Sequence, residues 1–269
     1  MTPSTPFYAR EGLHTALYDA MHEAYLGESS VAGDAAWYAA RAREWGGPVL
    51  EGGVGTGRVA LEIARAGVEV VGFDRSEGML RVAEAKRALE PPAVAARVTL
   101  LRAGFLDFDL RRTFPLALVP FRAFQSLLDP VEQAAALARF RDHLAPGGRL
   151  VIDLFDPRYE FLLPGSLPQR ERTGLRHPVR GTEVRVEILS RDLDPVAQVF
   201  REEWRFRELD AGGRVLLEES EVLAMRWSFR WEMRHLFART GLEVEAEWSD
   251  FRGSPPAYGK EQVWVLRRA

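Results

Sequence analysis

The stretch Val49-Leu50-Glu51-Gly52-Gly53-Val54-Gly55-Thr56-Gly57-Arg58 joins an apolar strand to a helical run that continues to Gly67. Glycine at every second position allows a tight turn and lets a ligand approach the backbone, as in α/β folds that bind nucleotides at the end of a strand. The next apolar run, residues 68–73, ends in Asp74, whose carboxylate can accept both hydroxyls of a ribose. The sequence therefore predicts a site for a nucleotide-like cofactor.

Strand and helix patterns alternate on both sides of this loop. Helices are expected at 14–26, 35–45, 79–89, 130–144 and 230–240, and strands at 98–101, 116–119, 149–153, 242–248 and 262–266. Such alternation is typical of an α/β fold. We therefore predict a Rossmann-like, doubly wound, mostly parallel sheet of seven strands. Residues 1–157 would form the N-terminal helices and the main part of this domain, and residues 226–269 would complete it.

Residues 158–225 break the alternation and have the pattern of an inserted antiparallel cap. Side chains alternate over residues 182–190, with Val184, Val186 and Ile188 set against charged neighbours, which indicates a strand with one buried face. A second strand is expected around residues 200–206, and the hairpin sequence at residues 210–213 leads to a third at 215–225. We predict a three-stranded cap over the cofactor site.

Composition limits the classes of function. The net charge of -3 and the pI near 6.0 give no attraction to nucleic acid or to an anionic membrane. The absence of cysteine excludes disulfides and thiolate metal sites, and the five histidines show no ligand spacing, so no metal is predicted. The segment Met1–Pro6 lacks the features of a signal peptide, and the sequence has no apolar run of membrane-spanning length. We expect a cytoplasmic monomer or homodimer.

The glycine loop fits two kinds of cofactor. Residues 55–60, GTGRVA, formally satisfy the dinucleotide pattern G-x-G-x-x-G/A. However, Glu51 ends the preceding strand and gives E-x-G-x-G-x-G, and the dinucleotide pattern has no acid at that position. With these residues and the segment 72–80, GFDRSEGML, the sequence resembles the class I S-adenosylmethionine-dependent methyltransferases from about Tyr8 to the C-terminus. The resemblance implies that S-adenosylmethionine is the cofactor and S-adenosylhomocysteine the product.

In that family the glycine loop wraps the methionine end of the cofactor, the acid after the second strand holds the ribose, and Met79 would pack on the adenine. An aromatic residue from the N-terminal helices closes over the cofactor. The resemblance implies the following cofactor-binding residues: Tyr18, Tyr38, Glu51, Gly53, Gly55, Thr56, Gly57, Arg58, Asp74, Arg75, Met79, Gly104, Phe105, Leu106, Val119 and Pro120.

The third family motif departs from the usual pattern. Gly104 stands where related chains carry an aspartate that accepts the adenine amino group. That contact is therefore lost, taken by water, or moved to Asp107, while the backbone N–H of Phe105 could still recognise adenine. The loss of one such hydrogen bond corresponds to about 1 kcal/mol, so cofactor binding is still expected.

The fourth motif, residues 119–130, resembles a loop of small-molecule and amino-sugar N-methyltransferases. Many of these proteins have a histidine where this chain has Ser126, and a serine without a partner is not a general base. Methyl transfer from a sulfonium can rely on alignment and a dehydrated pocket, provided that an amine arrives neutral. Arg122 and Gln125 are the candidate catalytic residues that would contact the acceptor, and His143 and His235 are rival bases.

The leading hypothesis is a methyltransferase that acts by in-line transfer on a small molecule, most plausibly at an amine nitrogen. The cap favours a small-molecule acceptor, with no nucleic acid and no membrane as partners. A dinucleotide-dependent oxidoreductase is one alternative, although neither Lys86 nor Lys260 has a tyrosine four residues away to form a proton-donor pair. A catalytically silent protein that binds S-adenosylmethionine is the other.

Overall fold

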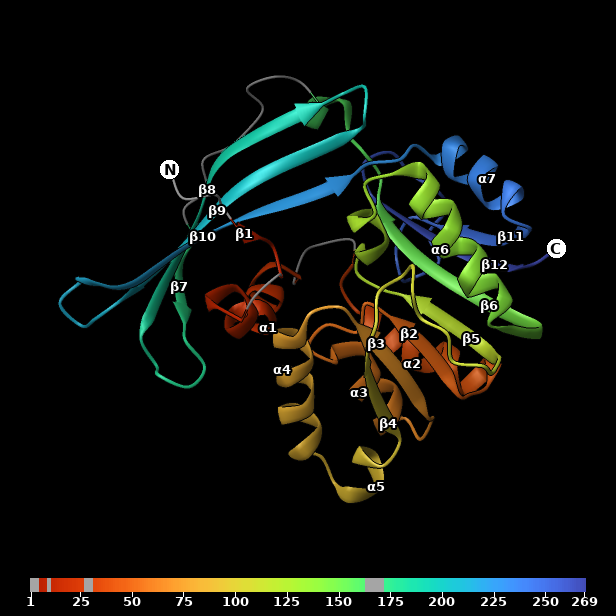
Figure 1. Cartoon of the computed structure of the whole chain (residues 1–269), viewed down its shortest axis with the longest axis horizontal. Coiled ribbons are helices and arrows are strands. Elements are labelled where there is room, and N and C mark those ends of the chain that lie inside the picture. Colours follow the sequence, from red (N-terminus) through yellow and green to blue (C-terminus); the bar gives the residue numbers. More distant parts are fainter. Residues whose placement is uncertain (1–4, 9–10, 27–30, 163–171) are drawn as a thin grey trace.

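The computed structural model describes residues 5–8, 11–26, 31–162 and 172–269, and Figure 1 shows how its two sheets are arranged. Part of the predicted cap, residues 163–171, and part of the N-terminal segment, Met1–Ser4, lie outside the described residues. None of the helices within the described ranges has both the length and the apolar character that crossing a bilayer requires.

The larger sheet has seven strands in the order β11-β12-β6-β5-β2-β3-β4. Its neighbouring strands run parallel, except that β12 runs antiparallel to both β6 and β11. The predicted Rossmann-like, mostly parallel sheet is therefore confirmed. Its strands are β2 (Val49–Gly52), β3 (Val70–Asp74), β4 (Val98–Arg102), β5 (Phe114–Val119), β6 (Leu144–Phe155), β11 (Leu242–Trp248) and β12 (Glu261–Arg268).

Helices cover both faces of this sheet, so its central strands are buried on both sides and consist mostly of apolar residues. Two neighbouring residues of β5 show the arrangement. Ala117 packs in one cluster with Phe140 of α6 and Phe237 of α7, whereas Leu118 packs in another with Ala42 of α2. The helices are α1 (Leu13–Leu26), α2 (Asp34–Trp45), α3 (Arg58–Arg65), α4 (Glu77–Ala88), α5 (Pro92–Ala95), α6 (Pro130–Asp142) and α7 (Arg230–Arg239), with 3-10 turns η1 (Ala123–Ser126) and η2 (Tyr159–Leu162).

The smaller sheet has five strands in the order β1-β10-β9-β8-β7, two more than the sequence predicted. The missed strand β1 is a two-residue segment that pairs parallel with β10, which is too short to show an alternating pattern. The missed strand β7 contains Gly174 at φ 83° and a register shift, and both interrupt the alternation. The strands are β1 (Thr5–Pro6), β7 (Arg172–Arg176), β8 (Glu183–Asp194), β9 (Val199–Leu209) and β10 (Val215–Arg226).

Helix α1 lies against the smaller sheet and ties it to the rest of the molecule (Figure 1). Leu17 of α1 packs in one cluster with Val186 and Phe206 of the cap. The ring of His14 lies 2.7 Å from the buried carboxylate of Glu221, measured from Nδ1 to Oε1. This packing leaves one side of α1 free to face the carboxyl ends of the parallel strands, where the predicted site lies.

Candidate functional site

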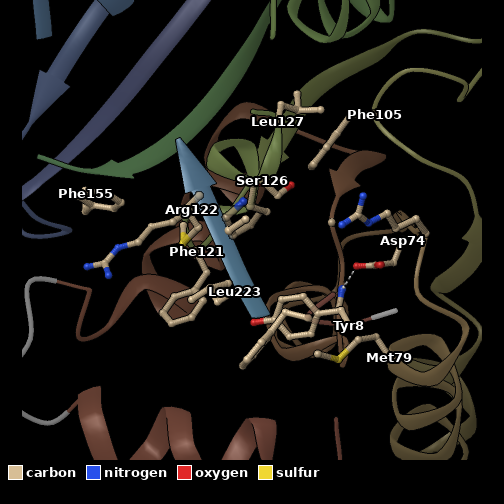
Figure 2. Close-up of a pocket in the computed structure, with 18 of the residues that line it drawn as sticks. Tyr8, Asp74, Met79, Phe105, Phe121, Arg122, Ser126, Leu127, Phe155 and Leu223 are labelled. Atoms are coloured by element: carbon tan, nitrogen blue, oxygen red, sulfur yellow. Dashed lines mark hydrogen bonds between the residues drawn. The ribbon is translucent and has the colours of Figure 1, made fainter. Parts of the chain in front are cut away.

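A cavity of about 1500 Å³ lies between the carboxyl ends of the parallel strands and the smaller sheet. Its walls come from the loops after β2, β3, β4 and β5, from α1, and from β9 and β10. Figure 2 shows Tyr8, Asp74 and Met79 toward one end of this space, and Arg122 and Phe155 toward the other. Most of the residues predicted from the sequence meet in this cavity.

The glycine loop has the backbone conformation that the sequence predicted. Gly53, Gly55 and Gly57 have φ angles of 71°, 54° and 77°, a region in which only glycine is unstrained. A Cβ atom on Gly53 would lie 2.9 Å from the Cβ of Ala123, so this glycine also permits close packing. The loop thus leaves a shallow cradle that faces the cavity.

The carboxylate of Asp74 links the glycine loop to the start of α4. Its Oδ2 accepts a hydrogen bond from the backbone N–H of Gly55 at 2.9 Å, and its Oδ1 accepts one from Ser76 at 2.8 Å. The first of these bonds is drawn as a dashed line in Figure 2. Burial raises the pKa of Asp74 above its usual value, against the effect of these hydrogen bonds. The side chain lines the cavity, where it can receive hydroxyl donors.

Beyond the glycine loop, Glu51 presents a buried carboxyl group at the cavity wall. Its Oε2 has no hydrogen-bond partner in the described part of the chain, and burial raises the pKa of this group to about 8, although Arg58 opposes the shift. Arg58 forms an ion pair with Asp34, with Nη1 and Oδ1 2.6 Å apart. Thr56 donates a hydrogen bond to Asp19 of α1 at 2.7 Å. A buried acceptor without a partner fits the ammonium group of an amino-acid ligand such as the methionine end of S-adenosylmethionine.

The opposite end of the cofactor cradle contains the third motif. Met79 is buried and lines the cavity together with Arg75 and Leu106. The carboxylate of Asp107 accepts a hydrogen bond from the backbone N–H of Gly104 at 2.5 Å. Asp107 also lines the cavity, so a carboxylate stands beside the position where the motif lacks its usual acid.

Four predicted residues lie outside the cavity lining. The hydroxyl of Tyr38 donates a hydrogen bond to Asp153 at 2.5 Å, and Gln125 uses its amide to bridge the backbones of Phe155 and Arg226. Both side chains are buried and committed to these bonds, so the structure corrects the prediction that they contact cofactor or acceptor directly. The other two are Gly57, which packs on α4, and Val119, which is a core residue of β5.

The loop after β5 has an unusual conformation that the sequence did not reveal. Phe121 and Arg122 have positive φ angles of 54° and 62°, which are strained for residues with side chains. The carboxylate of Asp153 holds them, accepting hydrogen bonds from the N–H of Phe121 at 2.8 Å and of Arg122 at 3.0 Å. Burial raises the pKa of Asp153 to about 7, while the bond from Tyr38 lowers it. Asp153 thus aims both side chains into the cavity.

Arg122 lines the cavity, but its charge is already paired. Its Nε lies 3.2 Å from Oε2 of the buried Glu261, and its guanidinium lies 5.7 Å from the centroid of the Phe155 ring. Ser126, where relatives place a histidine, donates a hydrogen bond to the carbonyl of Ala123 at 2.7 Å. Among the residues that the structure describes, no base lies within hydrogen-bond distance of Ser126.

The cap closes this end of the cavity with aromatic rings and a paired acid. Trp204 donates its indole N–H to Glu202 at 2.9 Å, and Arg191 lies 2.7 Å from the same carboxylate. The guanidinium of Arg191 stacks on Phe161, 3.9 Å from the ring centroid. Of these residues, Phe161, Glu202 and Trp204 line the cavity together with Phe200, and their ring faces suit a partly apolar ligand that carries a positive charge.

Only one histidine among the described residues lines the cavity, and it is His22. Of the bases proposed from the sequence, His143 is bound to the backbone of Arg139 and Leu110, and His235 is exposed. The signal that could have found His22 is its spacing, because it follows Tyr18 by one helical turn and shares its face. The described residues contain no cluster of side chains suited to a metal ion.

Comparisons with known proteins agree with this geometry. The methyltransferase domain family matches residues 49–148, which span the glycine loop and the next three strands. A cypemycin N-terminal methyltransferase from a Streptomyces species is 28% identical over 240 residues, which cover 88% of this chain and 89% of that protein.

Solved structures with the same architecture include those of two methyltransferases. The S-adenosylmethionine-bound structure of CalS10, an amino pentose methyltransferase from Micromonospora echinaspora, is 27% identical with a TM-score of 0.70, and the match covers 97% of this chain and 100% of that one. The methyltransferase CcbJ from Streptomyces caelestis is 26% identical with a TM-score of 0.70, covering 88% and 95%.

Proposed function

Because this chain is an S-adenosylmethionine-dependent methyltransferase, we propose that it methylates a small molecule at an amine nitrogen. The observation that carries the proposal is the wall at the acceptor end of the cavity. Phe161, Phe200 and Trp204 present aromatic rings there, beside the carboxylates of Glu202 and Glu261, each of which is paired with an arginine. Its ring faces stabilise the positive charge that a neutral amine nitrogen gains as it accepts the methyl group, whereas a hydroxyl acceptor that gives up its proton keeps no such charge.

The cap supports a small acceptor rather than a polymer. It closes the cavity opposite the glycine loop, and α1 packs between the cap and the domain. A space of about 1500 Å³ is large enough for a cofactor of nucleoside size together with a ligand of sugar or short-peptide size. Two relatives support the same class, since CalS10 acts on an amino pentose and the cypemycin enzyme on an N-terminus.

When bound, S-adenosylmethionine supplies a methyl group that is already activated on a sulfonium. The chain's own residues then have to hold the acceptor in line and exclude water. The Asp153 carboxylate fixes the loop that carries Phe121 and Arg122, and the ring of Phe155 packs against that guanidinium. Since Ser126 has no base beside it, the acceptor amine has to enter as the neutral form.

The proposal is tested with matched acceptors. An amino sugar, a short peptide with a free N-terminus, and the same sugar with a hydroxyl replacing the amine are incubated with the protein and S-adenosylmethionine, and the products are read by mass spectrometry. We expect a methyl group on the amine compounds and none on the hydroxyl sugar. Methylation of oxygen or carbon, with the amines untouched, would refute the proposal.

A further inference from the structure

His22 stands apart from the other histidines of the chain because it is buried at the cavity wall. It lies in α1, one turn after Tyr18, and only 6% of its surface is exposed. Its ring packs edge-on against Phe121, with the centroids 4.5 Å apart, and stacks beside Tyr18 at 6.3 Å. These two rings hold the imidazole in place without hydrogen-bonding to it.

Both ring nitrogens of His22 lack a hydrogen-bond partner within the described ranges. Buried polar groups in folded proteins are nearly always paired, and an unpaired one commonly marks the place of a ligand or water. Burial, together with the positive charge of Arg58, lowers the pKa of His22 to about 4, so the ring is neutral at physiological pH. A neutral imidazole offers one N–H donor and one acceptor.

The charged groups around His22 place it at the cofactor end of the cavity. They come from four helices: Asp19 of α1, Asp34 of α2, Arg58 of α3 and Lys86 of α4. Arg58 exerts the largest of these effects, and the same residue acts on the orphaned carboxyl of Glu51. The acceptor wall, by contrast, is built from the cap and from β6 and β12.

The amino-acid end of S-adenosylmethionine carries one ammonium and one carboxylate group. Glu51 and His22, whose polar atoms lack hydrogen-bond partners in the described part of the chain, match these two groups. Glu51 has an acceptor oxygen without a donor, which suits an ammonium group. The field of Arg58 at His22 favours a negative group there, and the ring can supply a donor. We propose that His22 donates a hydrogen bond to the α-carboxylate of the bound cofactor, and that Glu51 receives its α-ammonium group.

Isothermal titration with two ligands tests this role. S-adenosylhomocysteine has the amino-acid end, and 5′-methylthioadenosine is its counterpart without that end. His22→Phe keeps a flat ring but removes the donor, so S-adenosylhomocysteine should bind about tenfold or more weakly, and 5′-methylthioadenosine within twofold of the unchanged protein. His22→Gln retains an N–H donor and should recover part of the loss. His235→Gln, at an exposed site, is the matched control and should change neither affinity.

Proton linkage gives a second readout that packing alone would not change. A carboxylate beside His22 raises the pKa of the ring in the complex, so His22 should add a proton uptake that grows as the pH falls from about 7 to about 5. This uptake is superimposed on the proton that Glu51 releases when it receives the ammonium group, a release that hardly varies over this range. The uptake is measured by titration in buffers of different ionisation enthalpy, and it should disappear in His22→Gln. An equal loss of affinity for both ligands, or a loss confined to acceptor use, would overturn the proposal.

Discussion

The two ends of the cavity are built in different ways. The cofactor end is formed mainly by one continuous segment, residues 51–107, in which each strand end and the loop after it supply the contacts. The acceptor end is assembled from distant segments, as in the Arg122–Glu261 ion pair, whose partners are 139 positions apart. Local backbone geometry therefore dominates one end, and long-range charge pairing dominates the other. Changes at the two ends should separate cofactor affinity from acceptor use.

The largest effect is expected at the glycine loop. Gly53→Val places a branched side chain at φ 71° and 2.9 Å from Ala123, so it combines backbone strain with a clash. We expect binding of S-adenosylhomocysteine to be lost and the free energy of unfolding to fall by about 2–5 kcal/mol, measured by titration and by denaturant unfolding.

A paired set of alanine variants separates strain from packing. Gly213 has a similar φ of 82° in the exposed hairpin, but nothing lies within 4 Å of an added Cβ. Gly213→Ala should therefore report strain alone, and Gly53→Ala should destabilise the protein more. Equal losses would mean that close approach at Gly53 has no importance.

The next effect in size is expected at Asp74. Asp74→Ala removes the carboxylate that binds the N–H groups of Gly55 and Ser76 and that is predicted to hold the ribose. Affinity for S-adenosylhomocysteine should fall by roughly 2 kcal/mol, a factor of about 30, with far-UV circular dichroism unchanged. Asp74→Asn keeps one acceptor oxygen and should lose less. Unchanged affinity in Asp74→Ala would place the ribose elsewhere.

Asp153 holds a loop at the acceptor end through backbone hydrogen bonds, as Asp74 does at the cofactor end. Asp153→Ala leaves the N–H groups of Phe121 and Arg122 without their acceptor in a strained loop. The free energy of unfolding should fall by roughly 1–3 kcal/mol, and the KM for the acceptor should rise by a larger factor than the affinity for S-adenosylhomocysteine falls, because Phe121 also packs on His22. Tyr38→Phe, which removes one donor from the same carboxylate, should show a weaker form of this pattern. A loss of cofactor affinity in Asp153→Ala as large as the rise in the acceptor KM would contradict the distinction between the two ends.

A smaller, pH-dependent effect is expected from Glu51. Its pKa is about 8 in the folded chain, well above the ordinary value near 4.5, because it is buried. Unfolding releases the proton between these values, so the contribution of Glu51 to stability is present below about pH 4.5 and is lost as the pH rises through about 8. Glu51→Gln should flatten the unfolding free energy of the ligand-free protein over this range, measured by denaturant titration. A retained slope would assign it to another group, such as Asp153.

The sequence predicted the cofactor end well because its information is local. Alternate glycines and a strand-terminal acid determine the conformation of the residues beside them, and Gly53, Gly55 and Asp74 line one cavity. The Rossmann-like sheet followed from the same periodic patterns. Tyr38 was misplaced because a tyrosine on an amphipathic helix can face either way, and its partner Asp153 is 115 positions distant.

The acceptor end could not be predicted in the same way. The positive φ angles of Phe121 and Arg122 are not encoded by glycine, and they depend on a carboxylate from a neighbouring strand. Gln125 was predicted in the right loop but points to the backbone of β6 and β10, since buried amide groups there need partners. Such contacts are decided by tertiary packing, which leaves no short-range pattern.

The smallest effect is expected at Ser126, and it tests whether the acceptor loop contains any base. Ser126→Ala removes only the hydrogen bond to the carbonyl of Ala123 on an exposed turn, so turnover should stay within a few-fold. His143→Gln should behave likewise, because that ring is bound to backbone away from the cavity. In both variants and in the unchanged protein, the pH–rate profile should follow the ionisation of the acceptor amine, with activity rising as the amine loses its proton. The profile is measured with two acceptors of different pKa, and its midpoint should move with the acceptor. A midpoint that stays near pH ~6.5 for both acceptors and vanishes in one variant would identify the replaced residue as a base. The acceptor end would then contain a residue that takes part in proton transfer, contrary to the comparison between the two ends of the cavity.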